Sequence, residues 1–213
     1  MGTFKKGILG GFSGKVGTVI GSNWRGLDVM RSLPKKSGVN PTAQQLEQRQ
    51  KFALITGFLS PISALLSAYF GNATGTSSRL NNAVSYHIKA AITGISPNFE
   101  INYAKVLLCK GELIGVKDAI MSAPVAGAVQ LDWANNAGQV LAEASDLLVA
   151  VLYNSDKAQF VVDEGSATRQ DATASIAIPA EFAGDTLHAW VAFTDAVQKK
   201  ASSSVYLGTV VAG

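Results

Sequence analysis

The pattern of hydrophobic and polar positions divides this 213-residue chain into three parts. Residues 1–38 are rich in glycine, and they contain the β-branched run 15–21 and the alternating run 27–33. Alternation of apolar and polar residues is typical of a strand, and glycine suits the turns between strands. We therefore predict a β-hairpin or an extended arm over residues 1–38.

Residues 39–97 follow a helical pattern instead. Asn40 can cap a helix, Pro41 suits its first position, and apolar residues then recur at helical spacing. Further helix starts fall at residues 60–61 and at about residue 79. The pattern predicts a helical region of three segments, the last of them ending near Thr93.

From residue 98 onward the pattern changes to short strands separated by turn residues. Strands at such spacing are typical of an antiparallel β-sandwich. Trp133, Trp190 and Tyr206 are expected in its core, with His188 on the same face as Trp190 because side chains alternate along a strand. The seven predicted strands are 102–109, 127–133, 146–153, 158–162, 173–178, 186–193 and 203–211.

Four segments of this last part, 129–133, 148–154, 184–193 and 204–208, resemble those of a fibronectin type III-like or immunoglobulin-like sandwich. A true antibody-type domain is excluded, because Cys109 is the single cysteine and no disulfide can join the sheets. Cys109 is expected to be a small core residue on a strand. The predicted fold class is α+β, in which an N-terminal β-hairpin arm (1–38) and a helical region (39–97) precede an all-β immunoglobulin/fibronectin III-like sandwich (98–213).

Charge is distributed unequally along the chain. Residues 1–100 hold 11 Lys or Arg and three acids, a net charge of +8. Residues 101–213 hold seven Lys or Arg and 12 acids, a net charge of −5. This asymmetry indicates a polyanionic partner for the basic half or head-to-tail attraction between subunits. Only 15% of residues are charged and the mean hydropathy is +0.21, which suggests that partner subunits cover apolar surface.

The sequence carries no motif for catalysis, a metal or a cofactor. Segment 10–15 departs from a phosphate-binding loop, because the spacing of its glycines is too short and Val16 follows the lysine. His87 and His188 are about a hundred residues apart, and neither has a nucleophile or a second ligand nearby in sequence. We expect a protein that is not an enzyme and has no catalytic residues, no metal site and no cofactor.

The candidate contact residues lie in the arm. They are basic or aromatic, so they could contact a neighbouring subunit or a polyanion, with the tryptophan available to stack on a base. These residues are Lys15, Trp24, Arg25, Arg31, Lys35 and Lys36.

Three motifs mark the chain as a whole: the glycine-rich run from Gly7 to Gly17, the tryptophan-glycine turn at 24–26 and the closing segment 204–208. Together they resemble an uncharacterised Bacteroidetes protein family of about this length. That resemblance implies no known activity. Separately, segment 40–52 is similar to capped helix starts in prophage-encoded structural proteins.

These observations favour a self-assembling structural protein, such as a phage-type virion or filament subunit, whose arm contacts neighbouring subunits. Its expected partners are itself, as a homo-oligomer or polymer, and other structural proteins. Contacts between unlike surfaces build rings or open helices. Two alternatives stay open: an adhesion or carbohydrate-binding module, and a nucleic-acid-binding protein that uses the basic N-terminal half.

The sequence also gives expectations about location. Lys5 and Lys6 precede only a short apolar run, so we expect synthesis in the cytoplasm without a cleavable signal. The apolar stretches are interrupted by Gly, Ser and Pro, so no membrane span is expected. The destination would be a virion or an extracellular assembly.

Overall fold

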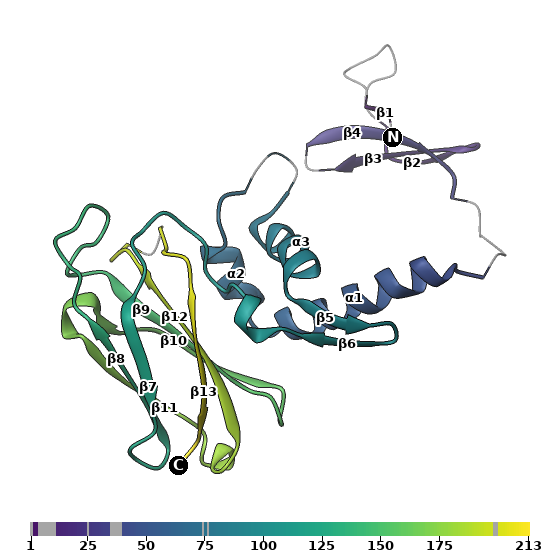
Figure 1. Cartoon of the computed structure of the whole chain (residues 1–213). Helices are drawn as coiled ribbons and strands as arrows, with labels where there is room; N and C mark the ends of the chain where they lie inside the picture. The colour runs from purple at the N-terminus through teal and green to yellow at the C-terminus, as the bar shows by residue number, and fades with distance from the viewer. Residues whose placement is uncertain are drawn as a thin grey trace. The chain divides into compact units, whose positions relative to one another are not determined.

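The computed structural model describes residues 2–3, 12–24, 26–34, 40–73, 75, 77–197 and 200–213. The chain forms two compact units, Met1–Ala43 and Gln44–Gly213 (Figure 1). The first unit contains the arm, and the second contains the helices and the sandwich.

The first unit, the arm, is a four-stranded antiparallel sheet in the order β1-β4-β3-β2. The central hairpin runs from Val19 opposite Ser32 to Trp24 opposite Leu27. Gly26 has a φ of +79°, a conformation that glycine adopts without strain in a tight turn. The predicted β-hairpin arm is therefore confirmed. Its strands are β1 (Gly2–Thr3), β2 (Gly14–Val16), β3 (Val19–Trp24) and β4 (Leu27–Ser32).

The second unit begins with the three predicted helices, α1 (Ala43–Leu59), α2 (Ser63–Tyr69) and α3 (Arg79–Ala90). The third helix ends earlier than predicted, because the chain turns into a hairpin of β5 (Ile92–Ile95) and β6 (Asn98–Ile101). The sequence pattern did not predict this hairpin.

Two antiparallel sheets form the sandwich, one in the order β10-β9-β12-β13 and the other in the order β11-β8-β7. Their consecutive strands are divided between two sheets, which is the arrangement of an immunoglobulin/fibronectin III-like sandwich and confirms the predicted fold class. The strands are β7 (Lys117–Ser122), β8 (Ala128–Ala134), β9 (Leu147–Asn154), β10 (Gln159–Thr168), β11 (Thr173–Ala177), β12 (Thr186–Thr194) and β13 (Val205–Val211).

One predicted strand, 102–109, is wrong. It begins with a short 3₁₀ helix, Tyr103–Lys105, and then runs beside the end of the sandwich. The backbone N–H groups of Leu108 and Cys109 donate to the Oγ of Ser204, at 2.9 and 3.3 Å, instead of to a strand. Val106, Leu108 and Cys109 are buried, so the composition of the segment matched a strand although its hydrogen bonds do not. The seventh strand of the sandwich is β7, which the sequence pattern did not predict.

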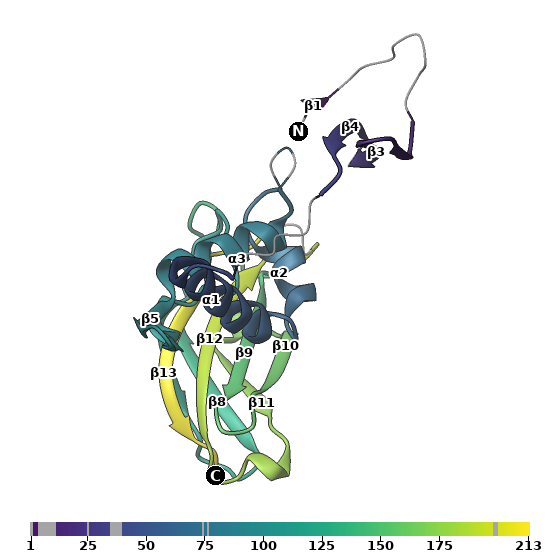
Figure 2. The same cartoon turned by 90° about the vertical axis from the view of Figure 1, so that its right-hand side faces the viewer.

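Both faces of the four-stranded sheet are covered. One face of β9 and β12 packs against the other sheet, through residues such as Leu152 and Phe193. The opposite face, with Val151 and Trp190, packs against the helices (Figure 2). The division at residues 38 and 97 stays a prediction. In the structure the helical region packs on one face of the four-stranded sheet and shares an apolar cluster with it. The continuous apolar run of β9 is explained by this burial on two sides.

Two of the three aromatic residues predicted in the core of the sandwich are buried, but only Trp133 lies between its two sheets, since Trp190 packs against the helices. Trp133 is 6% exposed and Trp190 is 1% exposed. Tyr206 is only partly buried and packs at the margin of the cluster beneath the helices. Cys109 is buried as expected, although not on a strand, and burial raises the pKa of its thiol to about 12.

A buried ion pair lies at one end of the sandwich. The Nη2 atom of Arg169 lies 2.9 Å from Oδ2 of Asp146, and both side chains are almost fully buried. Arg169 also donates to Oδ1 of Asn136 at 2.6 Å and to the carbonyl of Ile114 at 2.8 Å. Its guanidinium carbon lies 4.0 Å from the centroid of the Phe193 ring. These contacts connect segments that are distant in the sequence.

Candidate contact surface of the arm

The strand register of the arm brings candidate residues onto one face. Ile20 pairs with Lys15 of β2 on one side and with Arg31 of β4 on the other. Residues that pair directly share a face, and Trp24 shares the face of Ile20 because side chains alternate along a strand. Lys15, Trp24 and Arg31 therefore lie on the same face. The other three candidates, Arg25, Lys35 and Lys36, lie outside the described residues.

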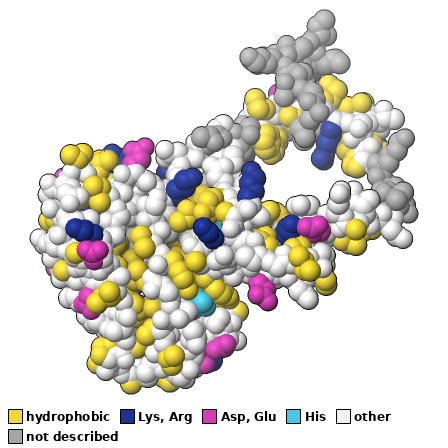
Figure 3. Space-filling model, in the orientation of Figure 1, with side chains coloured by type: hydrophobic (Ala, Val, Ile, Leu, Met, Phe, Trp, Pro, Cys, Tyr) yellow, Lys and Arg dark blue, Asp and Glu magenta, His cyan; other side chains and the backbone are white. Residues whose placement is uncertain are grey.

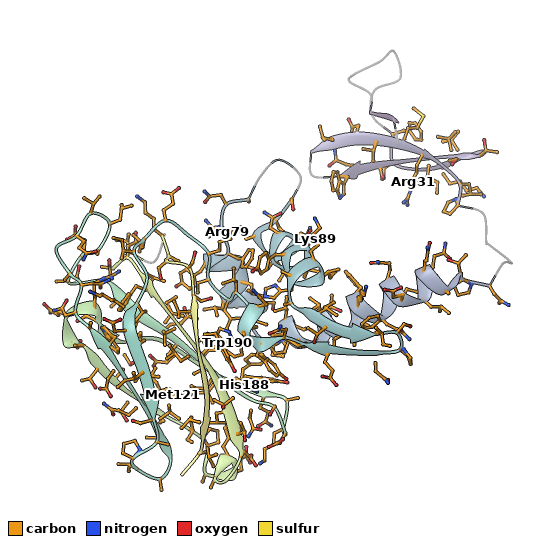
Figure 4. All side chains as sticks on the ribbon, in the orientation of Figure 1. Arg31, Arg79, Lys89, Met121, His188 and Trp190 are labelled. Atoms are coloured by element: carbon orange, nitrogen blue, oxygen red, sulfur yellow. The ribbon has the colours of Figure 1, made fainter. Side chains whose placement is uncertain are left out.

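A hollow of about 370 Å³ is lined by Ser22, Trp24, Val29 and Arg31 of this face, and by Asn23 between the first two. Val29 is buried, whereas Trp24 is 47% exposed. Arg31 extends from the sheet (Figure 4). An indole, an apolar floor and a guanidinium together suit a partner that offers both apolar and anionic groups.

A hydrogen-bonded turn lies next to Trp24. The Nδ2 atom of Asn23 donates to Oδ1 of Asp28 at 3.0 Å, and the N–H of Gly26 donates to Oδ1 of Asn23 at 3.1 Å. These bonds bridge the two strands next to the turn, on the face opposite Trp24. The backbone of the turn next to Trp24 is therefore held by hydrogen bonds within the hairpin.

Phe12 packs against the opposite face of the arm at Gly21. A Cβ atom at Gly21 would lie 2.3 Å from the carbonyl oxygen of Phe12 and 2.7 Å from its ring. Only glycine allows this close approach, which explains why a glycine occupies the middle of a strand.

The charges on the candidate face are not neutralised within the chain. In the described part of the chain, neither Lys15 nor Arg31 forms an ion pair within 4.0 Å. The residues outside that part contain no Asp or Glu. The first unit, residues 1–43, holds seven Lys or Arg and one acid, a net charge of +6. The second unit, residues 44–213, holds 11 Lys or Arg and 14 acids, a net charge of −3. The candidate face therefore suits an acidic surface.

Three of the residues that line this hollow, Ser22, Asn23 and Val29, were not among the predicted contact residues. The hairpin places Trp24 opposite Leu27, and Ser22 then falls opposite Val29. That register could have been inferred from the tryptophan-glycine turn. Whether Lys15 joins the same face depends on a second turn, between β2 and β3.

His87 belongs to the core of the second unit. Its Nδ1 atom lies 2.7 Å from the carbonyl oxygen of Ala83, and its Nε2 accepts a hydrogen bond from the N–H of Leu107 at 3.2 Å. An acceptor at Nε2 and a donor at Nδ1 define the neutral ring. Burial lowers the pKa of His87, which is the direction expected for an imidazole removed from water.

We expect the free energy of unfolding to decrease as the pH falls below about 6.5, the ordinary pKa of histidine. The unfolded chain takes up a proton there, whereas folded His87 stays neutral until a lower pH. Urea unfolding at pH 7.5 and 5.5 measures the loss, which should be smaller in His87→Gln. An equal loss in that variant would assign the effect to other groups. Burial also lowers the pKa of His188, so His188→Gln serves as a second comparison.

His188 lies on the same face of β12 as Trp190, as predicted (Figure 4). Its Nδ1 atom is 2.8 Å from the hydroxyl of Tyr206, and its ring centroid is 3.9 Å from that of Tyr103. It is part of an aromatic cluster between the sheet and the helical region.

Neither a metal cluster nor a membrane-spanning helix is found in the described ranges. In them, no group of three or more His, Cys, Asp or Glu side chains is arranged to hold a metal ion. In the same ranges, no single helix is long and apolar enough to cross a membrane. Helices α1 and α2 reach that length and apolar composition only together, as a pair bent by 88°.

The fold and the arm define the chain as a β-sandwich protein with a helical layer and an N-terminal β-arm. The chain belongs to a protein family of unknown function, DUF6266, whose match spans residues 11–208. The predicted membership in an uncharacterised family is thereby confirmed. No curated protein matches the chain.

Among solved structures, the chain is similar to the fibronectin type III domain of the human collagen α1(XX) chain. The sequences are 11% identical, the match covers 47% of this chain and 86% of that domain, and the TM-score is 0.36. The assignment of the sandwich rests on its strand order.

Proposed function

We propose that this protein is a self-assembling structural protein, such as a phage-type virion or filament subunit, whose arm contacts neighbouring subunits. The observation that carries the proposal is the arm itself. It is a separate compact unit that exposes apolar side chains and has a charge opposite to that of the rest of the chain.

The arm has little core of its own. Among its described residues, only Gly21 and Val29 are buried. Small sheets need a packed hydrophobic face for stability, so an exposed apolar face favours contact with another surface. Figure 3 shows hydrophobic side chains on the surface of the arm. The large ones that are exposed are Val16, Trp24, Leu27, Met30 and Leu33.

Charge supports a head-to-tail arrangement. The arm carries +6 and the second unit carries −3, so an arm is attracted to the second unit of another copy. Contacts between two unlike surfaces leave one of each free at the ends, which allows rings or open filaments to form.

The test is the native mass of the full chain by light scattering at low and high salt. We expect a large particle that shrinks at high salt, because salt screens attraction between exposed charges. The double variant Lys15→Glu/Arg31→Glu should shift the mass toward the 22.2 kDa monomer. The control Lys117→Glu reverses an exposed charge outside the arm, and because it makes the second unit more acidic it should not weaken assembly.

Two results would contradict the proposal. One is a monomer of 22.2 kDa for the full chain at both salt concentrations. The other is a chain lacking residues 1–38 that still polymerises, since the arm would then not be the connecting element.

A second candidate function is binding of single-stranded nucleic acid, which is favoured by the shared face of Lys15, Trp24 and Arg31. The two cations could contact phosphates while the indole stacks on a base. Fluorescence anisotropy with a labelled oligonucleotide should then show binding that weakens steeply with salt and is reduced in Trp24→Ala. Binding that does not respond to salt would exclude this function.

A further inference from the structure

A polar cavity of about 160 Å³ lies in the second unit, away from the arm. It forms where the end of α2 and the start of α3 meet the segments around residues 110–112 and 200–201. The charged residues that line it are Arg79, Lys110, Glu112 and Lys200. Its three cations and one acid give the cavity a net charge of +2.

Arg79 is the central cation of this cavity. It is half-buried at the first residue of α3 (Figure 4), and its Nη1 atom donates to the carbonyl of Ala68. A guanidinium cannot lose its proton in a protein, so the charge remains after burial. One hydrogen bond also leaves other N–H groups of the fork available for a ligand.

Two acids lie beside the lining of this cavity: Oδ1 of Asp195 accepts from the backbone N–H of Lys200 at 3.1 Å, and Oε2 of Glu164 accepts from the hydroxyl of Tyr69 at 3.2 Å. Among the described residues, neither forms an ion pair with the cations of the cavity.

Across the described ranges, Arg79, Lys110 and Lys200 form no ion pair within 4.0 Å, and Glu112, in the same cavity, is also unpaired at that distance. The few residues outside those ranges include no acid. Lys110 instead lies with its Nζ 5.9 Å from the centroid of the Tyr86 ring. A cluster of unpaired cations around a cavity is the environment that attracts an anion.

Backbone hydrogen bonds fix the segments that carry the lysines. The N–H of Lys110 donates to the carbonyl of Tyr69 at 3.0 Å, and the N–H of Gly71 donates to the carbonyl of Lys110 at 2.7 Å. A Cβ atom at Gly111 would lie 2.0 Å from the carbonyl oxygen of Ala201, so glycine permits the close approach of these two segments. The cavity is therefore built by packed backbone and not by side chains alone.

We propose that this cavity binds one tetrahedral oxyanion of the phosphate class. Arginine and lysine are the residues that bind phosphate oxygens through charge-assisted hydrogen bonds. The volume is about five times the share of one water molecule in the liquid, about 30 Å³, so a single group of five heavy atoms fits. The site is independent of the arm, so the proposal of anion binding can be tested separately from the proposed assembly.

The experiment is a titration of the full chain with inorganic phosphate. Binding is measured from the shift of the thermal unfolding midpoint and by calorimetry. A parallel titration with sodium chloride at equal ionic strength is the control. Phosphate should raise the midpoint more than sodium chloride does. Lys110→Met and Lys200→Met should each weaken phosphate binding about tenfold, because each removes a charge-assisted hydrogen bond.

Two further variants make the test specific to this cavity. Glu112→Gln should tighten binding, because it removes a like charge beside the anion. Lys89→Met, on the same helix as Arg79 but lining a different groove, should leave binding unchanged. Arg79→Met is less informative, since Arg79 also joins α3 to the end of α2.

Equal effects of phosphate and chloride would overturn the proposal. So would phosphate affinity that is unchanged in both Lys110→Met and Lys200→Met, because binding would then occur elsewhere on the basic surface.

Discussion

Replacement of Arg169 by methionine is expected to lower the free energy of unfolding by about 3–5 kcal/mol, the cost of leaving one member of a buried ion pair without its partner. Asp146, which is 2% exposed, would be left in the protein interior without the guanidinium. Asn136 and the carbonyl of Ile114 would lose their donors in the same variant. Urea unfolding followed by circular dichroism measures the loss.

Two comparisons separate this effect from general sensitivity to mutation. The double variant Arg169→Met/Asp146→Asn should recover part of the loss, because no unpaired charge stays buried. Lys51→Met removes the partly exposed ion pair with Glu47 and should cost about 1 kcal/mol or less. A loss in Arg169→Met as small as that in Lys51→Met would show that the buried pair contributes little.

Replacement of Trp190 by alanine is expected to cost about 3–5 kcal/mol, because it removes a large buried side chain and leaves a cavity. Trp190 lies between the sheet and the helices, in contact with Tyr103 and Tyr206. The variant should therefore weaken the attachment of the helical layer. Urea unfolding gives the total loss, and hydrogen exchange should show faster exchange in the helices first.

The two core tryptophans offer a matched comparison. The Nε1 atom of Trp190 is buried and has no hydrogen-bond partner among the described residues, whereas Nε1 of Trp133 donates to the carbonyl of Arg169 at 3.0 Å. Both Trp→Phe variants remove similar apolar surface. Trp133→Phe should be more destabilising by about 1–2 kcal/mol, because it leaves a buried carbonyl without its donor. Equal losses would contradict the assigned difference in hydrogen bonding.

The candidate face of the arm could be predicted only in part. Lys15, Trp24 and Arg31 were recognised as basic or aromatic residues in a glycine-rich segment, but their common face follows from the pairing of three strands. Register depends on the conformation of two turns, and a shift of one residue would move a side chain to the opposite face. The hollow between Trp24 and Arg31 is therefore a property of the pairing.

The oxyanion cavity could not be predicted at all. Arg79, Lys110 and Lys200 are separated by 31 and 90 residues in the sequence and share no motif. They meet because α2 and α3 pack on the four-stranded sheet and because segments 110–112 and 200–201 approach each other at Gly111. A sequence pattern indicates which residues are neighbours within one element, whereas four separate segments of the chain form this cavity.

The sequence by itself determined the arm, the three helices, six of the seven sandwich strands and the burial of Trp133 and Trp190. Each of these follows from local periodicity and turn residues, which act over a few positions. Only the tertiary structure decided that β9 and β12 are covered on both faces, that segment 102–109 is not a strand, and that Arg169 meets Asp146. Those outcomes depend on contacts between distant segments, whose free energies depend on burial and hydrogen bonding in the assembled core.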